Sequence, residues 1–196
     1  MRTLEITKEI LIKDFIVDKN LSKLIGLISF IVLTALGAFV RIPLPFTPVP
    51  ITLQTFFVLL AAAFLGRSWG TFSQLGYLAL GILGLPIFSN AASGLLAISG
   101  PTGGYLFGFV FGSWLIGHFM SRTKVLSFAR IFMVMSLGLA VIYVWGCLWL
   151  EILFKLGLRE TLMLGFWPFL PGAVLKLSAA SFIYSKMAKR AGEIFG

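Results

Sequence analysis

The feature that most constrains this chain is a series of long apolar runs that together occupy most of its length. A helix needs roughly 20 mainly apolar residues to cross the hydrocarbon core of a bilayer. Hydrophobic residues make up 59% of the chain and charged residues only 12%, whereas soluble domains carry about 25% charged residues. The sequence therefore predicts an all-α integral membrane protein, a bundle of six transmembrane helices. The six runs are about Leu21–Val40, Ile51–Gly66, Trp69–Phe88, Gly104–Met120, Ile131–Leu150 and Thr161–Ser185.

The first 20 residues differ from the rest because they mix both charge signs with apolar residues at helical spacing. This pattern is typical of an amphipathic helix that lies on the membrane surface. Glu5, Glu9 and Asp14 interrupt the apolar core that a cleavable signal peptide would need. We expect a surface segment over residues 1–20 and a single six-helix domain over residues 21–190.

The lysines and arginines predict the orientation, because cytoplasmic loops carry an excess of them. With a cytoplasmic N-terminus, 12 of the 16 fall on the cytoplasmic side, and Arg41, Lys155 and Arg159 fall on the other side. The remaining one, Lys176, lies within the sixth run. We therefore place both termini in the cytoplasm of a multi-pass protein of the cell (inner) membrane. Topology explains the net charge of +9, and nucleic acid is not an expected partner.

The two connections on the outer side have unusual sequences. In "RIPLPFTPVPITLQT" four prolines alternate with other residues, which removes backbone donors, prevents a helix and favours a stiff extended loop. The stretch "GLPIFSNAASGLLAISGPTGGYLFGF" has no charge and many glycines. Non-helical backbone at membrane depth is tolerated where it is buried in protein or lines a cavity. We expect these loops to cap a pocket that opens outward, the alternative being that they are only tight connectors.

Several classes of function lack the residues they require. All seven acidic residues fall outside the predicted span interiors, and the phosphate-binding motif of ATPases is missing. The one histidine, His118, and the one cysteine, Cys147, are too few for a metal site or for a nucleophile with an oriented base. We therefore expect no enzyme activity, no metal and no cofactor.

Lys176 is the one cation inside an apolar run, where an ammonium needs a partner. Together with polar groups near the outer face, it predicts a pocket for a small, partly apolar molecule that bears a carboxylate or carbonyl. Any one of the uncharged polar residues, taken alone, more often has a structural role. The candidate ligand-binding residues are Lys176, Asn90, Ser89, Thr52, Gln54 and Thr102, with Phe88 and Tyr105 as aromatic walls.

Four segments of the chain resemble the substrate-binding subunit of the energy-coupling-factor biotin transporters. They are "LPFTPVPITLQTFFVLLAAAFLG" from Leu44 to Gly66, "GLPIFSN", "GPTGGYLFGF" and "PFLPGAVLK", which ends at Lys176. The resemblance implies a six-helix membrane protein that captures biotin from outside. It also implies partners, a transmembrane coupling subunit and cytoplasmic ATPases, which fits a chain without a nucleotide motif.

The resemblance carries three further expectations. A partner-docking surface of small residues is expected on the first helix, at Thr34, Ala35 and Ala38, with ordinary packing in the bundle as the alternative. The family pattern has an aspartate three positions before the lysine, where this chain has Ala173. That departure leaves open a biotin precursor or lipoate as the ligand. A membrane scaffold or small membrane enzyme that uses His118 is the remaining alternative.

Overall fold

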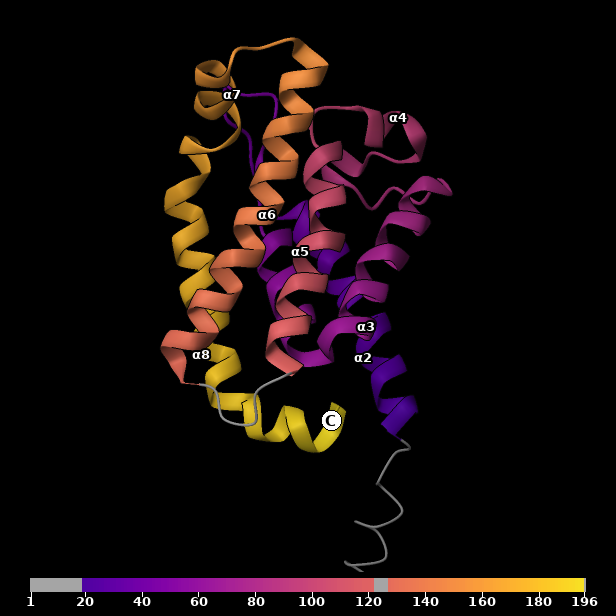
Figure 1. Ribbon diagram of the computed structural model, residues 1–196. Coiled ribbons are helices and arrows are strands. Elements are labelled where there is room, and N and C mark those ends of the chain that lie inside the picture. The colour runs from indigo at the N-terminus through magenta and orange to yellow at the C-terminus, as the bar shows by residue number, and fades with distance from the viewer. Residues whose placement is uncertain (1–18, 122–126, 196) are drawn as a thin grey trace, which may run out of the picture.

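A computed structural model describes residues 19–121 and 127–195. Its described part is a bundle of long helices capped at one end by the short helices α4 and α7 (Figure 1). The segment predicted as a surface helix over residues 1–20 falls almost entirely outside the described residues. Four described stretches are long and apolar enough to cross a membrane: Lys19–Phe39, Gln54–Ile82, Phe128–Phe154 and Leu158–Phe195.

Helix α3 (Gln54–Ile82) is a helical hairpin and contains two of the predicted spans. The chain reverses at Gly66, whose φ of 74° and ψ of −168° lie outside the helical region. The side chain of Gln54 in the first arm consequently reaches that of Tyr77 in the second. Gly70 packs against the backbone of Ala62 just past the reversal. The second arm ends at Ile82, before the predicted end at Phe88, because Gly84 has a φ of 105° that a helix does not allow.

The segment between α2 (Lys19–Phe39) and α3 folds back on itself as a small hairpin. Strands β1 (Arg41–Ile42) and β2 (Ile51–Thr52) pair antiparallel, with Arg41 opposite Thr52. The prolines lie within the loop between the strands, where their missing N–H groups remove nothing from the ladder. The prediction of a non-helical loop is confirmed, but the loop turns back between two paired strands and is not extended along its length.

Helices α5 (Gly103–Ser121) and α6 (Phe128–Phe154) pack closely through glycines. A Cβ atom on Gly108 would lie 2.8 Å from the Cα of Ile142, and one on Gly112 would lie 2.8 Å from the carbonyl oxygen of Gly138. Small residues at such positions let two helix backbones approach each other. Before α5, the loop contains the 3₁₀ turn η1 (Ser89–Ala91) and the short helix α4 (Gly94–Ser99).

The sixth predicted run, Thr161–Ser185, is not a single helix. Its first part forms α7 (Leu158–Gly165), a 3₁₀ turn η2 (Trp167–Phe169) follows, and α8 (Leu170–Phe195) carries the chain onward. Pro168 explains the break, because proline has no N–H to donate and disfavours helical geometry in the residue before it. The six predicted transmembrane segments therefore correspond to α2, the two arms of α3, α5, α6 and α8.

The described ends of the chain lie at the same end of the bundle, opposite α4 and α7 (Figure 1). Gly26 near the start of α2 packs against Phe195 at the end of α8 and against Leu65 beside the α3 reversal. This arrangement agrees with the prediction that both termini are on one side of the membrane. The proline-rich loop and the glycine-rich loop lie at the other end of the bundle, which also contains a cavity.

Candidate functional site

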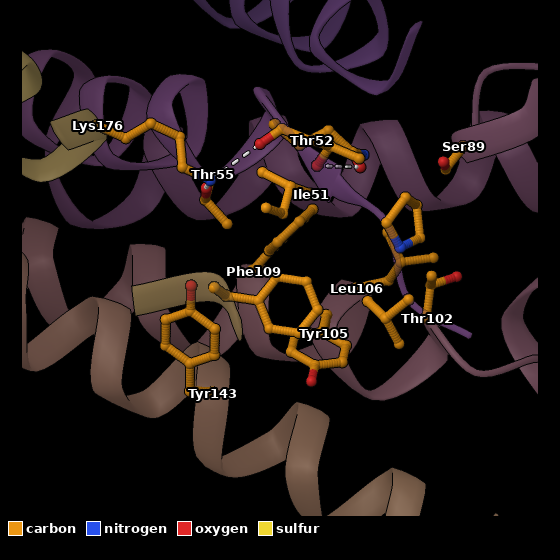
Figure 2. A pocket seen from close by; sticks show the side chains of 14 residues that line it. Ile51, Thr52, Thr55, Ser89, Thr102, Tyr105, Leu106, Phe109, Tyr143 and Lys176 are labelled. Atoms are coloured by element: carbon orange, nitrogen blue, oxygen red, sulfur yellow. Dashed lines mark hydrogen bonds between the residues drawn. The ribbon is translucent and has the colours of Figure 1, made fainter. Parts of the chain in front are cut away.

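A cavity lies where the β1–β2 hairpin meets α3, α5, α6 and α8. It encloses about 470 Å³ of space that protein atoms do not fill, part of it open to the outside. Its walls are mostly apolar and aromatic (Figure 2). The lining residues are Val49, Pro50, Ile51, Thr52, Gln54, Thr55, Ser89, Thr102, Tyr105, Leu106, Phe109, Tyr143, Phe169 and Lys176.

Lys176 is the charged residue of this cavity, and neutral oxygens alone stabilise it. Its ammonium Nζ donates to the carbonyl oxygen of Thr52 at 2.9 Å and to the hydroxyl of Thr55 at 2.6 Å. Among the residues that the structure describes, no carboxylate forms an ion pair with it. An ammonium has three N–H donors, so one remains for another acceptor. The cavity therefore keeps a net positive charge that an incoming oxygen can meet.

Aromatic rings form the wall contributed by α5, α6 and η2. The rings of Tyr105 and Tyr143 meet edge to face at 6.2 Å, and that of Phe169 lies 6.4 Å from Tyr143. The hydroxyl of Tyr105 donates to the carbonyl oxygen of Gly165 at 2.6 Å, which fixes the end of α7 against α5. These contacts give the cavity a rigid apolar wall for a flat or ring-shaped molecule.

The cavity also contains uncharged polar groups, some with hydrogen-bond partners and one without. Gln54 is hydrogen-bonded at both polar atoms of its amide, since its Oε1 accepts from the Thr52 hydroxyl at 3.1 Å and its Nε2 donates to Tyr77 at 2.7 Å. The hydroxyl of Ser89, in contrast, is buried and has no hydrogen-bond partner in the described part of the chain. A buried hydroxyl without a partner is unfavourable unless a ligand or water completes it.

The cavity has two polar ends. Figure 2 shows Lys176 on one side of the view and Ser89 with Thr102 on the opposite side, with Ile51, Phe109 and Tyr105 between them. The arrangement suits an elongated molecule that is polar at both ends and apolar in its middle.

The structure brings most of the predicted ligand-binding residues to this cavity. Asn90 and Phe88 are the two that do not line it. Asn90 is exposed and has a φ of 67°, which turns it away from the loop's buried side. Phe88 is buried behind the wall, edge to face with Tyr77 at 5.4 Å. The residues that line it as predicted are Lys176, Tyr105, Gln54, Thr52, Ser89 and Thr102.

Thr55 and Tyr143 are functional candidates that sequence reasoning missed. Thr55 lies in the first turn of α3, three residues after Thr52 of β2, and the apolar run around it gave no sign that it faces a cavity. Tyr143 is a polar aromatic in the middle of the fifth run, and nothing in the sequence says which face of α6 turns inward.

The expected partner-docking residues of α2 lie inside the bundle. Thr34 and Ala38 are completely buried, and Ala35 is half-buried. The Thr34 hydroxyl donates to the carbonyl oxygen of Phe30 at 2.7 Å. These three residues therefore pack within this chain, which is the alternative that the sequence left open.

The described residues contain no cluster of three or more metal-ligating side chains. His118 lies in the last turn of α5, at the opposite end of the helix from the cavity residues, where its Nδ1 is 3.4 Å from the guanidinium of Arg67 and its ring stacks on Trp114. It lines no part of the cavity.

Comparison with known proteins gives consistent matches along almost the whole chain. The model of the BioY family matches residues 9–193. A protein of Thermotoga maritima named biotin transporter BioY is 39% identical over 160 residues, which cover 82% of this chain and 92% of that protein. A probable biotin transporter BioY of Pyrococcus horikoshii is 37% identical, with 81% and 91% covered.

A solved structure shares the fold as well. It is the crystal structure of the S-component for biotin from an ECF-type ABC transporter, with a TM-score of 0.82 and 27% sequence identity. The match covers 88% of this chain and 94% of that one.

Proposed function

The chain belongs to the BioY family, and from that premise we propose that it is a membrane-embedded S component that binds biotin for import. The observation that carries the proposal is Lys176, an ammonium held by two neutral oxygens in an otherwise uncharged, aromatic cavity. Biotin has a carboxylate at one end, a ureido ring with two donors and a carbonyl at the other, and apolar atoms between them. Its chemistry therefore matches a cavity with two polar ends.

Equilibrium binding of radiolabelled biotin to the purified protein in detergent tests the proposal. We expect saturable binding that Lys176→Met reduces by roughly 10- to 100-fold, because a charge-assisted hydrogen bond is worth about 1.5–3 kcal/mol. Lys186→Met is the matched control, because Lys186 is exposed, lies over the ring of Phe182 and does not line the cavity. Absence of saturable binding to folded protein would remove biotin as the ligand.

The ligand oxygen that meets Lys176 is either the carboxylate or the ureido carbonyl. Biotin amide separates the two, because it keeps the ureido ring and loses the negative charge. If the carboxylate pairs with Lys176, the native protein binds biotin amide more weakly than biotin. The Lys176→Met substitution then has little effect on the affinity for biotin amide. If the ureido oxygen pairs with Lys176, the substitution weakens both ligands by the same factor.

A biotin precursor or lipoate is the second candidate ligand. The residue that favours it is Ala173, which is buried one turn before Lys176, where the resemblance predicts an aspartate. Competition by unlabelled desthiobiotin and by lipoate against radiolabelled biotin ranks these ligands. If desthiobiotin or lipoate displaces half of the radiolabelled biotin at a lower concentration than unlabelled biotin does, the result would favour the second candidate.

We further propose that partner subunits supply the energy for transport in the cell membrane. The chain has no nucleotide-binding motif, and the structurally similar S-component comes from an ECF-type ABC transporter. Biotin uptake into proteoliposomes containing this chain alone, or with a coupling subunit and ATPases, tests the proposal. ATP-dependent uptake only in the complete assembly would support it, and equal accumulation by the chain alone would contradict it.

A further inference from the structure

Tyr77 is a completely buried residue that does not line the cavity, yet its hydroxyl joins two parts of the site. It accepts a hydrogen bond from Gln54 Nε2 at 2.7 Å and donates one to the carbonyl oxygen of Ile87 at 3.0 Å. Gln54 belongs to the cavity wall, and Ile87 belongs to the loop that follows the second arm of α3. Tyr77 therefore connects the cavity wall to this loop through one hydroxyl group.

The connection extends to the cation of the cavity. Gln54 Oε1 accepts from the Thr52 hydroxyl at 3.1 Å, and the Thr52 carbonyl oxygen accepts from Lys176 at 2.9 Å. A series of four hydrogen bonds thus runs from Lys176 through Thr52, Gln54 and Tyr77 to Ile87. Each side chain in the series is held by the next, so their positions depend on one another.

In the loop at the end of this series, the two residues after Ser89 have an unfavourable backbone conformation. Asn90 and Ala91 have φ values of 67° and 53°, in the left-handed region that alanine in particular rarely adopts. Such conformations persist where the surrounding structure holds them, and they concentrate at functional sites. Ser89 itself contributes the one cavity hydroxyl that is buried without a partner in the described part of the chain.

The neighbouring contacts hold the same loop against Tyr77. The ring of Phe88, which is 2% exposed, packs edge to face on the Tyr77 ring at 5.4 Å. The Phe88 N–H donates to the carbonyl oxygen of Ala92 at 3.1 Å, which closes the loop on itself. The Tyr77 hydroxyl therefore acts on a compact loop, and a single lost hydrogen bond affects all of it.

We propose that Tyr77 is a positioning residue that holds the loop Leu85–Ala92 so that the Ser89 hydroxyl is available to the ligand. The inference rests on the proposed function, because it assumes that the cavity binds a small molecule. It assigns no ligand contact to Tyr77 itself. Its effect on binding passes through Ser89.

Hydrogen exchange of the ligand-free protein gives the first test. Tyr77→Phe is expected to speed amide exchange within Leu85–Ala92 by about fivefold, the size of one neutral hydrogen bond. Tyr184→Phe is the matched control, because Tyr184 is also buried, packs edge to face on Phe64 and does not line the cavity. Unchanged exchange of the loop in Tyr77→Phe would overturn the proposal.

A double-mutant cycle with radiolabelled biotin gives the second test. Ser89→Ala is expected to weaken binding about fivefold in the native protein and less than twofold in Tyr77→Phe, because the loop no longer presents the hydroxyl. A purely structural role for Tyr77 leaves the effect of Ser89→Ala unchanged, and that result would overturn the proposal. If native protein binds no biotin, the proposed function fails, while the exchange experiment still decides whether Tyr77 holds the loop.

Tyr77→Phe leaves the Gln54 amide without its acceptor, which itself destabilises the bundle. The double variant Gln54→Met/Tyr77→Phe removes both partners and is expected to be more stable than Tyr77→Phe alone. It still lacks the donor to Ile87, so its loop is expected to exchange as fast as that of Tyr77→Phe. A double variant whose loop exchanges as slowly as that of the native protein would show that the unpaired Gln54 amide, and not the lost bond to Ile87, loosened the loop, and would overturn the proposal.

Discussion

The ammonium of Lys176 in α8 lies 2.6 Å from the hydroxyl oxygen of Thr55 in α3. This hydrogen bond crosses the cavity wall and joins two helices that are far apart in the sequence. Thr55→Val keeps the shape of the side chain and removes the acceptor, so we expect unfolding to become easier by about 1–3 kcal/mol.

Thermal unfolding in detergent measures the loss in Thr55→Val. Thr71→Val is the control, because it also removes a hydroxyl with a 2.6 Å hydrogen bond, in this case one donated to the carbonyl oxygen of Arg67 at an exposed site. Equal unfolding temperatures for the two variants would show that the hydrogen bond between Thr55 and Lys176 stabilises the fold no more than one at an exposed site.

Ala173→Asp is expected to tighten ligand binding by placing a carboxylate next to Lys176. The two positions are three apart in α8, so their side chains are neighbours on one helix face. The carboxylate gives a ureido N–H a charged acceptor, for which we expect roughly 10- to 100-fold tighter biotin binding. Unaltered affinity in the radioligand assay would count against Ala173 as the reason for a different ligand preference.

The stability of the Ala173→Asp variant is expected to depend on Lys176. Ala173 is only 2% exposed, and a buried charge that loses its partner costs about 3–5 kcal/mol. Ala173→Asp/Lys176→Met should therefore unfold far more readily than either single variant. Additive effects on the unfolding temperature would show that the two side chains do not interact.

Gly66→Ala is expected to destabilise the hairpin of α3 by about 1–3 kcal/mol, because its φ of 74° and ψ of −168° suit glycine alone. A Cβ there would meet no atom within 4 Å, so the cost is one of backbone conformation and not of collision. Gly192→Ala is the control. It also has open space, but it lies within α8, where alanine is favoured by about 1 kcal/mol over glycine. Denaturation curves with opposite shifts for the two variants are the expected result.

Gly108→Ala is expected to push α5 away from α6 and to lower stability by about 1–3 kcal/mol. The added Cβ would lie 2.8 Å from the Cα of Ile142, and backbone atoms cannot rotate away. Gly172→Ala, whose Cβ would meet Ile51 at an ordinary 3.6 Å, should be tolerated. Indistinguishable unfolding of both variants would contradict the close packing of α5 and α6.

Helices were predictable from the sequence where apolar composition changes sharply at their ends, and less so where it does not. The run Trp69–Phe88 stays apolar past Ile82, so its true end depends on the backbone of Gly84 and not on hydropathy. Similarly, Pro168 lies inside an apolar run and divides α7 from α8, although hydropathy alone indicates one span.

The candidate site was predictable where polar residues occur in segments that cannot face lipid, as with Ser89, Thr102 and Lys176. It was not predictable where the local backbone or the helix face decides. Asn90 and Ser89 are adjacent, yet the left-handed turn puts one outside and the other in the cavity wall. Tyr143 reaches the cavity only because of how α6 is rotated against α5, which follows from the packing of their glycines.

The early reversal at Gly66 determines how deep a captured molecule must travel. The first arm of α3, from Gln54 to Leu65, is about 18 Å long at 1.5 Å per residue, whereas the hydrocarbon core is about 30 Å thick. On the topology that the lysines and arginines predict, Gly66 lies at the cytoplasmic side, and Gln54 in the cavity wall is then expected below the outer headgroups. A ligand that reaches it leaves its hydration water behind, so the hydrogen bonds from Lys176 and the cavity hydroxyls must replace that water for binding to be favourable.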